Sequence, residues 1–177
     1  MKTLYLLRHA KSSWDNPQLR DFDRPLNASG FRDAAMMAAR LRTLLQEKGE
    51  VLGTILSSPA LRTCTTAEIV AATLNLEPDQ LQMEPQIYLA SSGRLLQLVR
   101  RFDDSVSAAL VVAHNPALTD FANEMSNSSI DNIPTCGLVA LQLPVTHWME
   151  AEFGEARLLS EDFPNDSEAL VERLQQS

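Results

Sequence analysis

Short, almost wholly apolar runs constrain the fold of this chain more than any other feature of its sequence. Three of them have the length of a β-strand: 3–7 (TLYLL), 53–57 (GTILS) and 108–113 (AALVVA). Continuous hydrophobicity predicts strands that are covered on both faces, as in a parallel sheet packed between helices. A further strand is predicted at 137–143. The alternation of apolar and acidic residues at 149–153 predicts a half-exposed edge strand.

Helical periodicity fills the stretches between these strands, and each apolar stripe is expected to pack against the sheet. The stripes are Phe31, Ala34, Ala35, Ala38, Leu41 and Leu45; Cys64, Ala67, Ala71 and Leu74; Leu95, Leu98, Val99 and Phe102; and Leu118, Phe121, Ala122 and Met125. Gly49 is placed to end the first helix, and 166–176 is predicted to form a short closing helix. The alternation predicts an α/β three-layer sandwich with a mostly parallel central sheet, in a single domain over residues 1–177.

The composition narrows the classes of function and partner. A net charge of −8 argues against nucleic acid and anionic membranes as partners. Cys64 and Cys136 fit no metal or redox spacing, and we expect both to be reduced, buried residues. The apolar runs are too short to span a bilayer, and Arg8 interrupts the first run too early for a signal peptide. We therefore expect a cytoplasmic protein, and, with no exposed heptad pattern, a monomer.

Basic side chains follow three of the predicted strands at the point where each strand ends. Arg8 and His9 come directly after the first strand. Arg62 follows the second by about one helical turn, and His114 follows the third without a gap. Ligands of parallel sheets bind at the carboxyl ends of the strands, so we expect these four side chains to meet in one cleft. Clustering of cations would let an acidic protein bind an anion.

Two predicted helix starts face the same edge of the sheet. Ser58 and Pro59 suit an N-cap and the first helical position, which places Arg62 in the first turn, beside free backbone N–H groups. Asn115 and Pro116 repeat this device after the next strand. The sequence therefore predicts an anion site to which Asn115 contributes.

Two arginines and two histidines at one anion site indicate phosphoryl transfer. Arginine offers a planar fork of donors that matches phosphate oxygens, and a neutral imidazole is a nucleophile toward phosphorus. No Walker loop and no metal-ligand spacing occurs, so neither a metal nor another cofactor is expected. We predict that His9 is the nucleophile and that Arg8, Arg62 and His114 hold the phosphoryl oxygens.

The same residues carry a resemblance to the histidine phosphatase superfamily, the group that contains the cofactor-dependent phosphoglycerate mutases, and most closely to its short SixA-type branch of phosphohistidine phosphatases. The matching stretches are LLRHAKSSW at 6–14, DRPLNASG at 23–30, SSPALRTCTTA at 57–67 and VAHNP at 112–116. The resemblance implies that His9 becomes a phosphohistidine and that Arg8 and Arg62 bind the phosphoryl oxygens. It also implies a phosphoglycerate mutase-like fold and a pocket completed by His114.

Departures from the mutase-like pattern concern the proton donor. Mutase-like members carry a glutamate general acid where this chain has Gln86, with Glu84 nearby, and glutamine cannot donate a proton to a leaving alkoxide. Asp15 stands where those members have asparagine, and Asn115 stands where the other large branch has aspartate, which argues against phytase-like chemistry. Asp15 and Glu84 are therefore candidate proton-handling residues. Arg24 is expected either to line the cleft or to form a structural ion pair.

The absence of a glutamate general acid at position 86 affects which substrates the protein is expected to cleave. The imidazole of a phosphohistidine already carries a ring proton near neutral pH, whereas an alkoxide must gain a proton as it leaves. The prediction is a SixA-type phosphatase acting on a phosphorylated substrate such as a phosphohistidine-bearing signalling protein. The alternatives are a phosphomonoesterase for a small phosphometabolite and a phosphate-binding module without turnover. The two histidines argue against the module, because binding alone needs no nucleophile.

Overall fold

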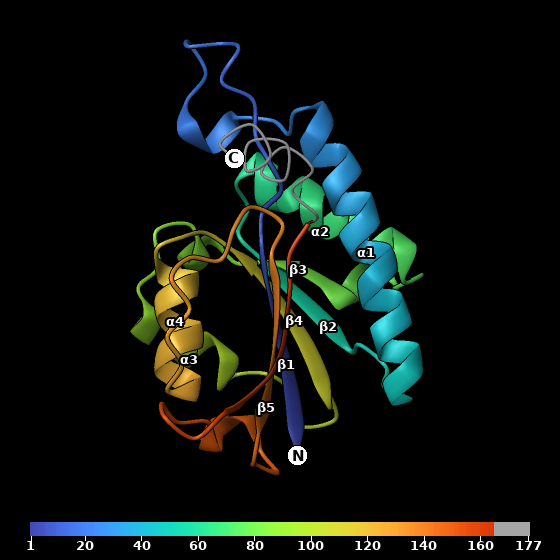
Figure 1. Ribbon diagram of the computed structural model, residues 1–177, viewed down its shortest axis with the longest axis vertical. Helices are drawn as coiled ribbons and strands as arrows, with labels where there is room; N and C mark the ends of the chain where they lie inside the picture. The colour runs from blue at the N-terminus through green and yellow to red at the C-terminus, as the bar shows by residue number, and fades with distance from the viewer. Residues whose placement is uncertain (165–177) are drawn as a thin grey trace, which may run out of the picture.

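A six-stranded sheet in the order β3-β2-β4-β1-β5-β6 forms the centre of the computed structural model, which describes residues 1–164 (Figure 1). The strands are β1 (Lys2–Arg8), β2 (Thr54–Ser57), β3 (Leu81–Met83), β4 (Ala108–Ala113), β5 (Leu138–Leu143) and β6 (Arg157–Asp162). The first four run parallel, and β5 and β6 pair in antiparallel fashion. The strands predicted from the apolar runs coincide with β1, β2, β4 and β5, which confirms a mostly parallel sheet.

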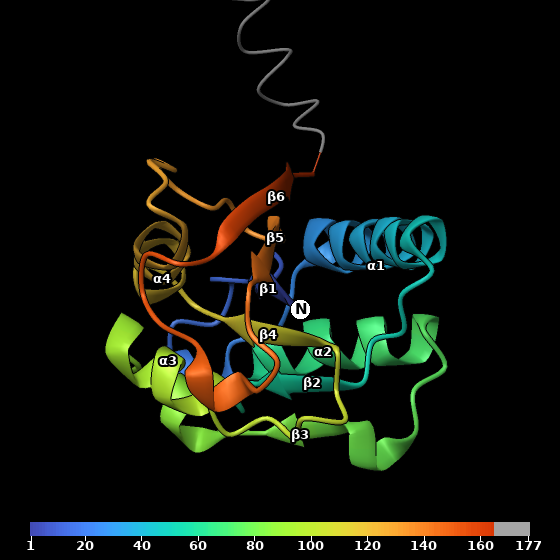
Figure 2. The ribbon, with the colours of Figure 1, turned by 90° about the horizontal axis from the view of Figure 1, so that it is seen from below.

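Helices cover both faces of this sheet (Figure 2). On one face lie α1 (Ala28–Lys48) and α2 (Leu61–Thr73), and on the other lie α3 (Ser92–Val99) and α4 (Ala117–Ser126). Short 3-10 segments stand in the connections: η1 (Asp21–Asp23), η2 (Pro78–Gln80), η3 (Pro85–Ile87) and η4 (Trp148–Glu150). The predicted three-layer α/β/α sandwich is thereby confirmed. Within residues 1–164, no helix is long and apolar enough to cross a lipid bilayer.

The central strand β1 shows why its apolar run is uninterrupted. Leu4 and Leu6 pack into the core that includes α3 and α4, whereas Tyr5 and Leu7 pack into the core that includes α1 and α2. Successive side chains of a strand point to opposite faces, so burial on both faces requires an apolar residue at every position. The apolar run therefore marks a strand at the middle of the sheet.

The ends of α1 follow from its capping residues. Asn27 is the N-cap, and its side-chain oxygen accepts a hydrogen bond from the backbone N–H of Gly30 at 2.7 Å. Gly49 ends the helix in the left-handed conformation, with φ of 61°, as predicted.

The buried stripe of α1 is rotated from the predicted one. Ala34, Ala38, Leu41 and Leu45 are buried as expected, but Phe31 and Ala35 are exposed and Met37 is buried in their place. At 100° per residue, Met37 lies at one margin of the buried face, and Phe31 and Ala35 lie at the opposite margin, which the sheet does not cover.

The prediction of an edge strand at 149–153 is wrong. This segment begins in the turn η4, with Trp148 and Ala151 buried and Met149 exposed. The Asp104 carboxylate anchors the turn by accepting a hydrogen bond from the backbone N–H of Trp148 at 2.9 Å. The antiparallel edge strand is β6. The opposite edge strand, β3, was not predicted because three mostly exposed residues give no periodic signal.

Both predicted helix starts are one or two residues too early. The N-cap of α2 is Ala60 rather than Ser58, and that of α4 is Pro116 rather than Asn115. Ser58 still accepts a hydrogen bond through its hydroxyl from the backbone N–H of Ala60, at 3.3 Å. The helix-start signal therefore located the right turn of chain but not the capping residue.

The two cysteines are free thiols in different settings. Cys136 is buried as expected, whereas Cys64 is only half-buried because it lies toward the open side of α2. The closing helix predicted at 166–176 lies outside the described residues.

Candidate active site

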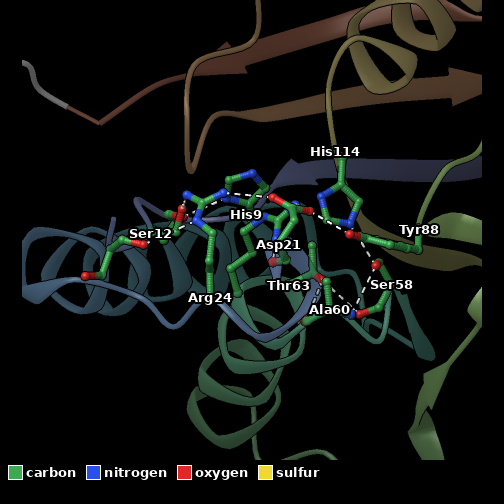
Figure 3. A network of polar contacts seen from close by, with 12 residues as sticks. His9, Ser12, Asp21, Arg24, Ser58, Ala60, Thr63, Tyr88 and His114 are labelled. Atoms are coloured by element: carbon green, nitrogen blue, oxygen red, sulfur yellow. Dashed lines mark hydrogen bonds and ion pairs between the residues drawn. The ribbon is translucent and has the colours of Figure 1, made fainter. Parts of the chain in front are cut away.

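The carboxyl ends of β1, β4 and β2 bring the four predicted residues together. Arg8 ends β1, and Arg8 pairs in register with Ala113, the last residue of β4. His9 and His114 therefore emerge side by side, with ring centroids 5.5 Å apart (Figure 3). Arg62 reaches the same place from the first turn of α2. A cleft of about 470 Å³ opens here, lined by Arg8, His9, Lys11, Ser12, Trp14, Arg24, Asn27, Arg62, His114, Asn115 and Thr135. We call it the main cleft.

The ring of His9 is held as a neutral base with one free nitrogen. Its Nδ1 lies 2.7 Å from the carbonyl oxygen of Ala10, and a carbonyl only accepts, so Nδ1 carries the hydrogen. The Nε2 atom then bears the lone pair. Burial, together with the charges of Arg62 and Arg8, lowers the pKa of His9 to about 4 although the Ala10 carbonyl opposes the shift. His9 is therefore uncharged and nucleophilic near neutral pH.

The ring of His114 has one nitrogen bonded to Ser58 and one buried nitrogen that has no hydrogen-bond partner among the described residues. Its Nε2 lies 2.8 Å from the Ser58 hydroxyl, whose oxygen also accepts from the backbone of Ala60. The Nδ1 atom is buried without a hydrogen-bond partner. Burial and then the charge of Arg62 lower the pKa of His114 to about 3, so the ring is neutral. If Ser58 donates to Nε2, the ring hydrogen sits on Nδ1, on the side where His9 lies (Figure 3).

Hydrogen bonds to the protein orient Arg8 and Arg62 but use only some of their N–H groups. Arg8 donates from one terminal nitrogen to the carbonyl of Ile133 at 3.0 Å, and its Nε is buried without a partner. Arg62 donates to the backbone oxygen of Asp21 at 2.7 Å and to its carboxylate at 2.9 Å. A guanidinium has five N–H groups, so each arginine keeps donors for an anion.

Asp21 and Tyr88 complete the site and were missed by the sequence analysis. The Asp21 carboxylate accepts from Arg24 at 2.9 Å, from Arg62, and from the Tyr88 hydroxyl at 2.6 Å. The Tyr88 bond, followed by the two arginines, lowers the pKa of Asp21 to about 2. The Tyr88 ring also packs edge-on against His114, with centroids 5.6 Å apart. No local pattern pairs residues so distant in the chain, so only the fold reveals this contact.

A second hollow of about 350 Å³ adjoins the main cleft. It is lined by Asp21, Arg62, Ile87, Tyr88, Leu89, Ala90, Leu95, Ala113, His114, Asn115, Pro116 and Ala117. We call it the side hollow. Arg62, His114 and Asn115 border both spaces, so one cationic and two neutral polar side chains stand between them.

Asn115 borders both spaces, but its side chain is already bonded to the protein. Its amide nitrogen donates to the Ile133 carbonyl at 2.8 Å and to Asn132 at 2.9 Å, and its oxygen accepts twice from Thr119. These bonds use both amide hydrogens and both oxygen lone pairs. Its contribution to phosphate binding stays a prediction.

Arg24 fulfils both expectations stated for it. It borders the main cleft, and its guanidinium pairs with Asp21, donates to the Ser13 carbonyl at 3.2 Å and to the Ser12 hydroxyl, and lies 3.2 Å from the centre of the Trp14 ring. The loop that carries Trp14 is thereby tied to the site.

The structure brings neither candidate proton-handling residue into the site. Asp15 is exposed on the loop beside Trp14, and the Glu84 carboxylate accepts from the backbone N–H of Gln86 at 3.0 Å. Neither residue borders the main cleft or the side hollow.

Comparisons with known proteins show which proteins this chain is similar to. A family model described as the histidine phosphatase superfamily (branch 1) matches residues 4–84. An uncharacterized chloroplastic protein of Arabidopsis thaliana is 34% identical over 158 residues, which span 85% of this chain and 70% of that protein. An uncharacterized protein of Mycobacterium tuberculosis (strain H37Rv) is 28% identical over 168 residues, or 89% and 99% of the two chains.

Solved structures show the same fold. A crystal structure described as a candidate phosphohistidine phosphatase SixA of Agrobacterium tumefaciens superposes with a TM-score of 0.75 and 28% identity, covering 92% of this chain and 98% of that one. A protein histidine phosphatase SixA complexed with tungstate gives a TM-score of 0.70 at 22% identity, over 92% and 97% of the chains. At 22% identity, the similarity to the tungstate complex shows a shared fold only.

Proposed function

Since this chain belongs to the histidine phosphatase superfamily, in its SixA-type branch, and is a phosphatase, we propose that it hydrolyses phosphohistidine on a protein, with His9 as the nucleophile. The observation that carries this proposal is the bond from His9 Nδ1 to the Ala10 carbonyl. It leaves the Nε2 lone pair free in a cleft lined by four basic residues, Arg8, Lys11, Arg24 and Arg62. A nucleophile held neutral among cations suits attack on a phosphoryl group.

The first step moves the phosphoryl group from substrate to enzyme. The Nε2 lone pair of His9 forms a bond to phosphorus as the bond to the leaving nitrogen breaks and its electron pair stays on that nitrogen. Arg8 and Arg62 hold the oxygens, and His114 adds a third donor in the tautomer that carries its ring hydrogen on Nδ1. Positioning and positive charge supply most of the catalysis because the transferred group is loose and strongly anionic.

The second step returns His9 to its resting form. Water attacks phosphorus, the bond to Nε2 breaks, and that nitrogen recovers its lone pair as inorganic phosphate departs with both hydrogens of the water. The cations that stabilise the first transition state stabilise the second, because the charge develops on the same oxygens.

Phosphohistidine is favoured over an alkyl phosphate because the residues that line the site offer no evident acid. Among the described residues that border the two spaces, Asp21 is the only carboxyl group, and it is held ionised by Arg62, Arg24 and Tyr88. General acid catalysis contributes about 10²–10⁴-fold to the departure of a basic leaving group. An imidazole that already carries a ring proton can leave without general acid catalysis.

The test compares substrates on the purified protein. We expect kcat/KM for a phosphohistidine peptide to exceed that for a sugar phosphate by about 10²-fold or more. The same assay is made on His9→Ala, which is expected to lose turnover. His147→Ala is its matched control and is expected to keep turnover, since His147 is an exposed histidine paired with Asp104 at the other end of the sheet. Equal efficiency on the sugar ester would assign the protein to small phosphometabolites, and binding without turnover would make it a phosphate-binding module.

A further inference from the structure

The side hollow lies where a leaving group has to go. In-line displacement places the nucleophile and the leaving group on opposite sides of phosphorus. His9 borders the main cleft, whereas Arg62 and His114 stand between that cleft and the side hollow. A phosphoryl group held by Arg62 and His114 and attacked from His9 therefore directs its leaving group into the side hollow.

The walls of the side hollow suit a small flat ring. Ile87, Leu89, Ala90 and Leu95 supply apolar surface, and the Tyr88 ring stands beside them. Tyr88 is fixed from two sides, edge-on to Phe22 at 5.1 Å and edge-on to His114 at 5.6 Å. Apolar and aromatic walls with a small number of placed polar groups are typical of a site that binds a small molecule or ring.

Among the polar side chains that line the side hollow, the carboxylate of Asp21 is the one that only accepts hydrogen bonds. Its two oxygens accept three hydrogen bonds, from Arg24, Arg62 and Tyr88, of the roughly four that a carboxylate can accept. Its side chain remains half exposed and borders the hollow. These bonds fix the carboxylate in place and leave it able to accept one more.

We propose that Asp21 is a specificity-determining residue, whose carboxylate accepts a hydrogen bond from the ring N–H of a protonated nitrogen leaving group in the side hollow. This inference rests on the proposed function. It explains why a phosphatase keeps an anion beside a site for an anionic substrate. Arg24 and Arg62 offset the repulsion between Asp21 and the phosphoryl group, and the remaining acceptor site of the carboxylate favours a leaving group with a ring N–H over an alkoxide, which has no hydrogen to donate.

The chemistry balances without a proton donor. The substrate ring bears phosphorus on one nitrogen and a hydrogen on the other, and it is positively charged. When the phosphorus–nitrogen bond breaks, its electron pair returns to the ring, which departs as neutral imidazole with its hydrogen still directed at Asp21. Asp21 itself neither gains nor loses a proton.

A selectivity ratio tests this role. N-Phosphoimidazole presents a ring N–H when protonated, whereas 4-nitrophenyl phosphate has no N–H and its leaving group needs no acid. We expect Asp21→Asn and Asp21→Ala to lower the ratio of kcat/KM for phosphoimidazole to that for nitrophenyl phosphate by about 10- to 100-fold, the range for one hydrogen bond to a charged group. Thermal melts of both variants verify that they are folded.

Asp23→Asn is the matched control. Asp23 belongs to the same segment, η1, and pairs with the exposed Arg20, so the change removes the same charge without touching the site. Its selectivity ratio is expected to equal that of the wild type. Parallel losses on both substrates in the Asp21 variants, with the ratio within about twofold of the wild type, would overturn the inference and assign Asp21 to holding Arg62.

The two proposals fail in different ways. A wild-type protein that cleaves nitrophenyl phosphate but not phosphoimidazole would refute the proposed function and this inference together. A wild-type protein that prefers phosphoimidazole, with the preference intact in Asp21→Asn, would refute only the role of Asp21.

Discussion

The two ends of the central sheet both bury polar side chains, but these side chains are hydrogen-bonded to one another at one end and partly unpaired at the other. At the amino end, Glu50 accepts from the hydroxyls of Tyr5 and Thr3 at 2.5 and 2.8 Å, and Lys48 donates to Tyr5 at 3.2 Å. At the carboxyl end, Arg8 Nε and His114 Nδ1 are buried without partners. Buried polar groups are normally paired, because an unpaired one costs about 1–3 kcal/mol. The amino end is built for stability, and the carboxyl end gives up stability to keep donors ready for a ligand.

The largest expected contrast between the two ends is in catalysis by histidine. We expect His9→Ala to lower kcat by about 10⁴-fold or more, because it removes the nucleophile and no other residue substitutes for it. His147→Ala, at the amino end, is expected to leave kcat within about twofold. Steady-state rates on phosphohistidine measure both. Comparable activity in the two variants would erase the functional distinction between the ends.

Arginine substitutions sharpen the contrast on a smaller scale. Arg62→Ala is expected to lower kcat/KM by about 10²- to 10³-fold, since it removes a preorganised donor to the developing charge. Arg40→Ala is the control, because Arg40 forms a half-exposed ion pair with Asp162, away from the site. A loss below about tenfold in Arg62→Ala would show that this guanidinium serves Asp21 rather than the phosphoryl group.

Stability is expected to respond in opposite directions at the two ends. Tyr5→Phe leaves the half-buried Glu50 short of a donor and is expected to lower the free energy of unfolding by about 1–3 kcal/mol without loss of activity. Arg8→Met replaces a cation whose pKa is lowered by burial and by Arg62. It is expected to raise stability by about 1 kcal/mol while activity is lost. Urea unfolding measures both, and equal destabilisation would contradict the comparison.

A further expected effect at the carboxyl end is the pH dependence of stability. Burial lowers the pKa of His9 from 6.5 to about 4, so between these values the unfolded chain binds more protons than the folded one. His9 is therefore expected to contribute about 1–2 kcal/mol to the stability lost as the pH falls from 7 to 5, beside a contribution of the same sign from His114, whose pKa is also lowered. His9→Asn should remove that part of the slope in urea unfolding curves recorded at both pH values. An unchanged slope would mean that His9 titrates near its ordinary pKa.

The residues that the sequence placed correctly are those whose role is local. Arg8, His9 and His114 stand directly at strand ends, and a strand buried on both faces is visible as an apolar run, so the topology of a parallel sheet brings them together. The N-caps were misplaced by one or two positions, although Ser58 and Asn115 still accept hydrogen bonds from backbone N–H groups near the helix starts, those of Ala60 and Thr119. Neither error moves a side chain of the predicted cleft.

The parts that sequence reasoning missed depend on contacts between distant segments. Asp21 meets Arg62 and Tyr88 across 41 and 67 residues, and no periodic pattern reports such a pairing. Asp15 is a candidate because it replaces an asparagine of the mutase-like pattern, and Glu84 because it is close to Gln86, but neither residue borders the main cleft or the side hollow. The carboxylate that borders the site was thus beyond prediction from local patterns, although its neighbour Arg24 had been singled out.

The central claim is that the lone pair of His9 Nε2 receives the phosphoryl group. The most direct measurement is to mix the wild-type protein with phosphohistidine for a short time, quench in base, and locate the phosphate by mass spectrometry of peptides. The account predicts one phosphate per chain on His9, stable in base and labile in acid, and none in His9→Ala. Turnover with no phosphate on His9, or phosphate on His114 instead, would contradict it.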